Sequence, residues 1–378
     1  MDALKHHGHL TQVELAGATG LSPATVSNIV KELALGGVVH TSVSARSGRR
    51  AIEVTLARQF GLVAGLHFSA RQLRIAISDV NRTVVAENQV PLALEHRYDR
   101  ELDRATLLLS DMAESVDATL PDILAVGIAI PAAVELGTGL ISTPGMMKGW
   151  KGVNIAEEFE NRIQRPVFVD NEANLGGLAE LRAGAARGAR GAAYIRIGHS
   201  ISAGLLIDGA LFRGVTGKAG QIGHTTIDEN GPICHCGNRG CLETLAGGPA
   251  LLELFRGDPG MQRLRDLLQR ADGGDASARR VIADAGRHIG IATASLCNLF
   301  DPELIVVGGE LAQAGETLLA PMRHALERSA LASSDGVAAV VSGELGERAE
   351  LLGCLALAID HVGFDTEARA PGSRGLRA

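Results

Sequence analysis

The most informative stretch of this sequence is Gly223-His224 followed, after nine further residues, by Cys234-His235-Cys236-Gly237-Asn238-Arg239-Gly240-Cys241. Three thiolates and one imidazole form the ligand set of a structural zinc site, which leaves no open position for a catalytic water. The two glycines between the last two cysteines allow the sharp turns that aim the sulfurs at one point. We therefore predict one structural Zn²⁺ per chain that adds to folding stability, with the ligands His224, Cys234, Cys236 and Cys241.

Two alternatives to this ligand set stay open from the sequence. His235 is a competing ligand, although we expect its side chain to point away from the cysteines that flank it. The other alternative is a loop of reduced thiols that holds no metal. The odd total of five cysteines does not suit disulfide pairing, so either reading predicts a reducing, cytoplasmic environment.

The composition is typical of a globular protein with two or three domains. A chain of 378 residues is long for one core, and its 46% hydrophobic and 21% charged residues are ordinary proportions. No apolar run of about 18 residues occurs, so we expect no membrane span. The first ten residues lack the apolar core of a secretion signal.

The charge is unevenly distributed along the chain. The net charge is −7, yet residues 1–60 hold six Lys and Arg against four acids, which leaves +2 there and −9 in the remainder. A mildly basic head on an acidic body suits a protein that contacts phosphates at one end only.

Residues 10–36 predict a helix-turn-helix. Thr11 and Glu14 have the spacing of a capping box, Gly20 suits the turn, and Ser22-Pro23 opens the second helix. Helical spacing predicts that four apolar side chains of that helix face a core, namely Val26, Ile29, Val30 and Leu33.

Residues 38–42 and 52–56 predict two strands that flank a basic tip at residues 44–50, as in the wing of a winged helix. Small and amide side chains at the start of the second helix suit base edges, whereas the lysine and arginines suit phosphates. The predicted DNA-binding residues are Ser22, Ala24, Thr25, Ser27, Asn28, Lys31, Arg46, Arg49 and Arg50. The alternative is a small helical subdomain with a solvated basic loop.

The body alternates short β-branched strands with helices, which predicts an α/β fold. One set of strands lies at residues 62–66, 73–78, 83–89 and 125–130, with a long helix near 103–118, and a second set begins at 194–197. Two such sets predict two lobes with a ligand cleft between them.

Several motifs together resemble the ROK family of repressors, open reading frames and kinases. The resemblance rests on His224, the cysteine cluster with Leu242-Glu243-Thr244, Asp170-Asn171-Glu172-Ala173-Asn174, residues 301–309 and Leu351-Leu352-Gly353. It implies an actin-like, hexokinase-like (ribonuclease H-like) two-lobed domain after the winged helix-turn-helix. It also implies assembly as a homodimer or homotetramer.

The corresponding domain boundaries are residues 1–58 for the DNA-binding head, 59–186 for the first lobe and 187–365 for the second lobe. We expect the last helix to return to the first lobe and residues 366–378 to form a disordered tail.

The phosphate loops of the family's kinases are degenerate here. Where those kinases carry Asp-x-Gly-Gly-Thr, this chain has His67-Phe68-Ser69-Ala70-Arg71, and the second loop reads Gly198-His199-Ser200-Ile201-Ser202-Ala203-Gly204. The added β-carbons crowd the space that phosphates need. The sequence therefore predicts a chain without kinase activity.

The sugar-binding motifs are partly kept. The resemblance implies that Glu172 replaces the catalytic aspartate, that Gln221 replaces a glutamate, and that Met146 replaces an amide in the loop ending at Trp150. The predicted sugar-binding residues are Asn171, Glu172, Gln221, His224 and Glu243. Two alternatives stay open: Glu172 is an ordinary surface or helix-capping carboxylate, and Gln221 has no role in ligand binding. We expect His224 to be a zinc ligand in the first place.

The sequence thus predicts a repressor of carbohydrate genes that binds a palindromic double-stranded operator and is gated by a sugar or sugar phosphate. The second hypothesis is a DNA-binding regulator whose pocket ignores sugars and answers to a protein partner or an unusual ligand. The third is an active sugar kinase with an appended head.

Overall fold

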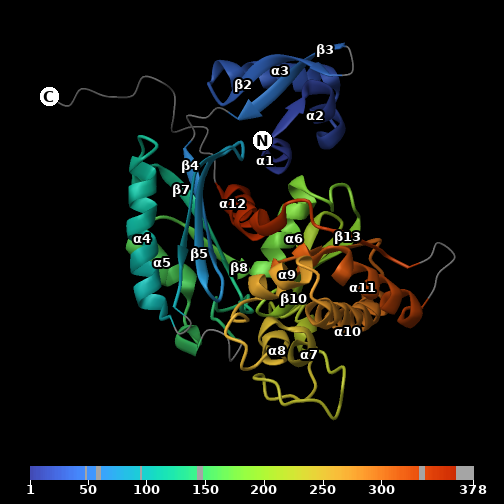
Figure 1. Cartoon of the computed structure of the whole chain (residues 1–378). Helices are drawn as coiled ribbons and strands as arrows, with labels where there is room; N and C mark the ends of the chain where they lie inside the picture. The colour runs from blue at the N-terminus through green and yellow to red at the C-terminus, as the bar shows by residue number, and fades with distance from the viewer. Residues whose placement is uncertain (47–48, 57–60, 94–95, 143–147, 332–336, 363–378) are drawn as a thin grey trace.

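The computed structural model describes residues 1–46, 49–56, 61–93, 96–142, 148–331 and 337–362. Three sheets divide this part of the chain into a three-stranded head and two five-stranded lobes (Figure 1). The predicted α/β class with an N-terminal winged helix is confirmed. No helix within the described ranges combines the length and apolarity that crossing a bilayer requires. The predicted tail and Met146 lie outside these ranges.

The head is built from three helices and a small sheet. Its elements are α1 (Asp2–His7), β1 (His9–Thr11), α2 (Gln12–Thr19), α3 (Pro23–Leu35), β2 (Val39–Arg46) and β3 (Arg49–Leu56). The capping box forms, because the Glu14 amide donates to Thr11 at 3.2 Å and the Thr11 amide donates to Glu14 at 2.7 Å. Gly20 has φ 69°, and the Ser22 hydroxyl accepts from the Thr25 amide at 3.2 Å.

Two sequence expectations for the head are wrong. Ile29 was expected in the core, but 40% of it is exposed, whereas Val26 and Val30 are 4% exposed. A four-residue spacing keeps two side chains on one helix face, and the narrow core of this small head accommodates little more than that face. The wing strands also run further than expected: Arg46 pairs with Arg49, so most of the supposed loop at 44–50 is paired strand.

The first lobe is a mixed sheet with the strand order β6-β5-β4-β7-β8. Its elements are β4 (Leu62–Phe68), β5 (Gln72–Asp79), β6 (Val84–Pro91), α4 (Tyr98–Glu114), β7 (Ile123–Ile130), α5 (Ile155–Ile163) and β8 (Val167–Asn171). Helices α4 and α5 cover one face, where Trp150, Phe159 and Leu102 are fully buried. The long helix begins five residues earlier than expected and ends at Glu114.

The second lobe has the strand order β11-β10-β9-β12-β13. Its strands are β9 (Gly191–Ile197), β10 (Ile201–Ile207), β11 (Ala210–Phe212), β12 (Leu304–Gly308) and β13 (Ala339–Ser342). Its outer layer contains α7 (Glu243–Ala246), α8 (Gly248–Glu253), α9 (Leu264–Asp272), α10 (Ala276–Phe300) and α11 (Glu316–Ser329). Ile195, Ile197 and Val307 of the sheet share one buried cluster with this layer.

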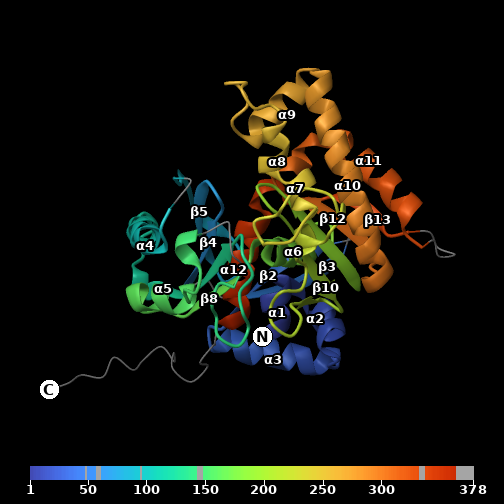
Figure 2. The same ribbon diagram turned by 90° about the horizontal axis from the view of Figure 1, so that it is seen from below.

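Two helices fill the space between the lobes. Helix α12 (Ala349–His361) packs on β4 and β7 of the first lobe, and α6 (Glu172–Ala183) packs on β9 and β10 of the second. The molecule is therefore layered as helices, sheet, helix pair, sheet and helices, with α4 and α5 on one side and α10 and α11 on the other (Figures 1 and 2). This arrangement places the carboxyl ends of several strands around one central region.

Candidate functional site

The predicted zinc ligands lie together in the second lobe. His224 ends the short helix η4 (Ile222–His224), and the three cysteines come from the loop that precedes α7. Their ligand atoms all lie within 4.8 Å of one another, with His224 Nδ1 3.6 Å from Cys234 Sγ and the sulfurs of Cys236 and Cys241 3.7 Å apart. A tetrahedral site with Zn–S bonds of about 2.3 Å places its sulfurs roughly 3.8 Å apart, so the donor set fits this metal.

The thiols of the cluster need a nearby cation in order to ionise near neutral pH. Burial, and then the neighbouring sulfurs of Cys236 and Cys234, raise the pKa of Cys241 to about 12. Burial raises the pKa of Cys234 as well. A divalent cation at the centre is what would let such thiols ionise near neutral pH.

His235 lies closer to the Glu243 carboxylate than to the sulfur of Cys234. Its Nδ1 is 3.3 Å from a Glu243 carboxylate oxygen and 3.9 Å from Cys234 Sγ. His224, His235 and Glu243 form a second group whose ligand atoms also lie within 4.8 Å of one another. The zinc loop is thereby tied directly to Glu243, one of the residues predicted to bind sugar.

The two first-lobe sugar candidates are engaged by other protein groups. Glu172 is 1% exposed, and its two carboxylate oxygens contact Arg196 Nη1 at 2.8 Å and His67 Nε2 at 2.9 Å. Asn171 caps α6 by accepting from the Ala173 amide at 2.8 Å and donates to the Ala132 carbonyl at 3.1 Å. Glu172 is therefore not the surface carboxylate that the sequence left as an alternative, and its role in sugar binding stays a prediction.

The second-lobe candidates lie next to the cysteine loop. Glu243 accepts a hydrogen bond from the Ile201 amide at 3.2 Å, and Gln221 is the N-cap residue of η4, which ends at His224. Burial raises the pKa of Glu243 to about 7; the Ile201 amide opposes this shift and the Glu172 charge adds to it. The structure thus brings Glu172 and Glu243 within electrostatic reach of each other.

A buried polar network is the feature that sequence reasoning missed. Arg196 on β9 contacts Glu172 on one side and Glu350 of α12 on the other, where Nε lies 3.0 Å from the carboxylate. The Tyr194 hydroxyl donates to the same Glu350 oxygen at 3.0 Å. The signal that could have found it is a single arginine in the otherwise apolar strand Gly191–Ile197.

Arg196 also lies where the second phosphate loop begins. A β-carbon on Gly198 would lie 2.9 Å from its Nη1 atom. Burial would lower the pKa of Arg196, but the Glu172 and Glu350 carboxylates outweigh that effect and hold its pKa above the ordinary value. A permanent protein cation therefore lies against the loop that approaches phosphates in a kinase.

The predicted DNA-reading face of α3 points outward. Ser22, Ala24, Thr25, Asn28 and Lys31 are exposed, and Ser27 is half-buried. The wing arginines lie at the end of the hairpin, where Ala45 pairs with Arg50. Their side chains lie outside the described part of the structure.

Sequence comparison settles the family. The ROK family pattern matches residues 63–361, and a winged helix-turn-helix DNA-binding pattern matches residues 1–40. The chain belongs to the ROK family. The xylose repressor of Caldicellulosiruptor bescii is 29% identical over 371 residues, which cover 93% of this chain and 92% of that one. The Escherichia coli K12 DNA-binding transcriptional dual regulator NagC is 30% identical over 366 residues, with 92% and 88% covered.

Solved structures give the same assignment. A ROK family transcriptional regulator described as a homologue of the E. coli MLC protein superposes with a TM-score of 0.75 at 25% identity and covers 93% of this chain and 92% of its own. A ROK family glucokinase from Streptomyces griseus, in complex with glucose and AMPPNP, has a TM-score of 0.70 at 26% identity. It covers 79% of this chain and 99% of its own. The regulator thus matches the chain including the head, and the kinase matches a smaller share.

Proposed function

We propose that this ROK family protein is a DNA-binding repressor of carbohydrate genes whose operator affinity is set by a sugar or sugar phosphate in the cleft between the lobes. The observation that carries the proposal is the combination of an outward-facing α3 with a kinase-like domain in which Arg196 lies against the loop that corresponds to a phosphate loop. The first feature suits DNA reading, and the second disfavours phosphoryl transfer.

The argument against kinase activity rests on charge and space. Nucleotide phosphates are bound by backbone amides at glycine-rich turns, which allow close approach. Here His67 replaces an acidic loop residue and is hydrogen-bonded to Glu172, the residue that would have to act as the base. A carboxylate that already contacts an arginine and a histidine is a poor acceptor for a sugar proton. We therefore propose that the domain binds ligands without turning them over.

The proposed effector contacts are Glu243, Gln221 and His224, which come from the second lobe next to the zinc loop. Relatives named as xylose and N-acetylglucosamine repressors make small polyols the first class to test. The structural zinc would fix the loop that holds His235 against Glu243, so metal loss should disturb the pocket as well as the fold.

Operator recognition requires pairing of two heads. One winged helix reads a short half-site, so a homodimer or homotetramer on a palindromic operator would supply the specificity that a regulator needs. A protein that acts on DNA in this way would work in the cytoplasm.

A second candidate function is a DNA-binding regulator that does not respond to sugars. The burial of Glu172 and the two hydrogen bonds of Asn171 to protein groups favour it, because these contacts compete with a ligand hydroxyl. Such a protein would be controlled by a partner protein or by a ligand of different chemistry.

A thermal-shift screen of the purified chain separates these candidates. The probes are D-xylose, D-glucose, N-acetylglucosamine, N-acetylglucosamine 6-phosphate and ATP with Mg²⁺. A ligand that binds only the folded state raises the melting temperature. A shift with one sugar and none with ATP supports the gated repressor, and a flat panel supports the second candidate. A shift with ATP together with phosphate transfer to a sugar contradicts both.

A further inference from the structure

The helices α6 and α12 lie side by side with almost no space between their backbones. A β-carbon on Gly353 of α12 would lie 1.9 Å from the Leu175 carbonyl oxygen of α6. Each helix is also held tightly to its own lobe. A β-carbon on Gly127 would lie 2.0 Å from the Cys354 carbonyl oxygen of α12, and one on Gly204 would lie 2.3 Å from the Ala173 carbonyl oxygen of α6. Any relative movement of the lobes must therefore displace one helix against the other.

The first turns of the two helices, their inner ends, meet at Arg196. Glu172 starts α6, Glu350 lies in the first turn of α12, and both carboxylates contact the guanidinium of Arg196. Both side chains are at most 3% exposed, so water does not screen these ion pairs. A ligand that changes the position of Glu172 thereby acts on the start of both helices.

The outer ends of the same helices meet beneath the head. Arg182 of α6 pairs with Asp360 of α12 at 3.1 Å, at a point about 15 Å along the helices from Glu350. Helix α1 of the head lies against α12 (Figure 1). Burial, and then the cations of Arg182 and Arg82, lower the pKa of His7 in α1.

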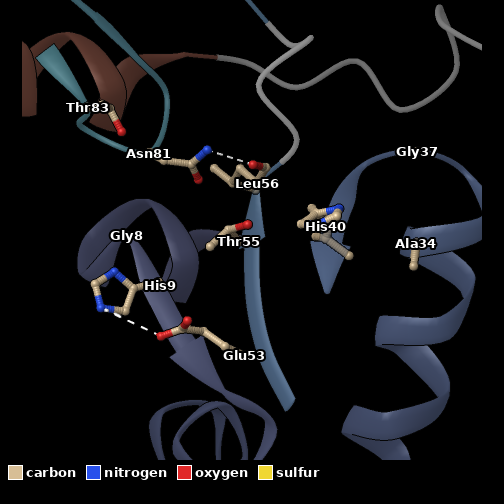
Figure 3. A pocket seen from close by; sticks show the side chains of 11 residues that line it. Gly8, His9, Ala34, Gly37, His40, Glu53, Thr55, Leu56, Asn81 and Thr83 are labelled. Carbon is tan, nitrogen blue, oxygen red and sulfur yellow. Dashed lines mark hydrogen bonds and ion pairs between the residues drawn. The ribbon is translucent and has the colours of Figure 1, made fainter. Parts of the chain in front are cut away.

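The head packs directly on the body, and a cavity lies next to this contact. Val80 of the first lobe belongs to the buried cluster of the head, and Asn81 Nδ2 donates to the Leu56 carbonyl at 2.7 Å. Beside this attachment lies a cavity of about 950 Å³, lined by His40 and Glu53 of the head and by Thr83 of the body, among others (Figure 3).

We propose that ligand binding between the lobes shifts α6 against α12 and that this shift changes the position of the DNA-binding head. The shift would begin at the Glu172–Arg196–Glu350 contact and would reach α1 of the head through the Arg182–Asp360 contact. This inference rests on the proposed function and names the residues that perform its regulation. Close-packed helices shift between discrete arrangements and do not deform continuously, which suits them to relay a two-state signal.

Hydrogen–deuterium exchange on the full-length zinc-loaded chain tests the relay without sugar or DNA. Glu350→Gln keeps the shape of the side chain but removes the inner charge. We expect exchange in peptides covering α1 and β1 to change on the order of five- to tenfold, the lower end of couplings between distant sites. A change confined to β9 and the first turn of α12, with α1 as in the wild type, overturns the proposal.

Two further variants make the result specific. Asp360→Asn breaks the outer contact and should alter exchange in α1 while β9 keeps its wild-type rate. Glu316→Gln breaks a pair of similar length with Arg323 on α11, 2.8 Å in the native chain, and should leave the head unchanged. A head response to Glu316→Gln as large as that to Glu350→Gln refutes the route.

Sugar experiments separate this inference from the proposed function. A sugar that stabilises the wild type and shifts its operator affinity, but shifts that of Asp360→Asn equally, overturns the relay and leaves the proposed function intact. A sugar panel without effect on the wild type overturns the proposed function, whereas the exchange experiment, which contains no sugar, still decides the relay.

Discussion

Replacing Arg196 by methionine should destabilise the chain strongly, because two buried carboxylates lose their cation. Arg196 lies 2.8 Å from Glu172 and 3.0 Å from Glu350, whose side chains are 1% and 3% exposed. Removing one partner from a buried ion pair costs about 3–5 kcal/mol, against a total folding stability of roughly 5–15 kcal/mol. In lobes of this size the corresponding fall in melting temperature is about 6–20 °C.

The pH dependence of folding stability provides a second, independent test of this prediction. Burial alone would raise the pKa of Glu172, but Arg196 and His67 outweigh it and hold the pKa below its ordinary value of 4.5. In the wild type this carboxylate therefore stabilises the fold above about pH 4.5, and the contribution is lost as the pH falls below that value. In Arg196→Met the Glu172 carboxylate is buried without its arginine, so its pKa should rise and the variant should lose less stability than the wild type, or gain some, between pH 7 and pH 5.

The assay is urea denaturation followed by circular dichroism at pH 7 and pH 5, with differential scanning calorimetry at pH 7. The control is the triple variant Arg196→Met, Glu172→Gln, Glu350→Gln, which removes all three charges of this contact and should recover most of the lost stability. A loss below about 1 kcal/mol, which is the average for any substitution, refutes the reasoning. So does a triple variant that is less stable than the single one.

Three further predictions concern the metal, the DNA and the helix pair. Cys236→Ser should reduce zinc, measured by plasma mass spectrometry, well below one per chain and lower the melting temperature; full zinc content would contradict the proposed ligand set. The double variant Arg49→Ala, Arg50→Ala should bind the operator more weakly in a filter-binding titration. The slope of log binding constant against log salt concentration should become shallower by about 2, since each phosphate contact contributes roughly 1. An unchanged slope would show that the wing does not contact the DNA. Gly353→Ala should lower the free energy of unfolding, measured by urea denaturation, by about 1–3 kcal/mol because its β-carbon meets the α6 backbone. The control Gly17→Ala, whose β-carbon has nothing within 4 Å, should be neutral or stabilising. Equal effects of the two substitutions would disprove the close contact.

Local chemistry explains why the head was partly predictable. The capping box at Thr11 and Glu14 and the turn at Gly20 depend on neighbours within a few residues, and both form as expected. The exposure of Ile29 was not predictable from helical spacing, because it depends on how wide a surface the rest of the head offers to α3. The length of the wing strands likewise depends on pairing between β2 and β3.

The sequence by itself determined the family and the order of head and ROK domain, and it predicted four zinc ligands whose ligand atoms the structure places within 4.8 Å of one another. Each of these rests on motifs that are short and contiguous or closely spaced. Only the tertiary structure revealed the buried ion-pair network around Arg196. Arg196, Glu172, Glu350 and His67 are separated by up to 283 positions, yet they share one buried network. No spacing rule brings such residues together, because their contacts arise from the packing of α6 and α12 between two sheets. The energy of a buried charge depends on its partners in space, and those partners become visible only once the chain has folded.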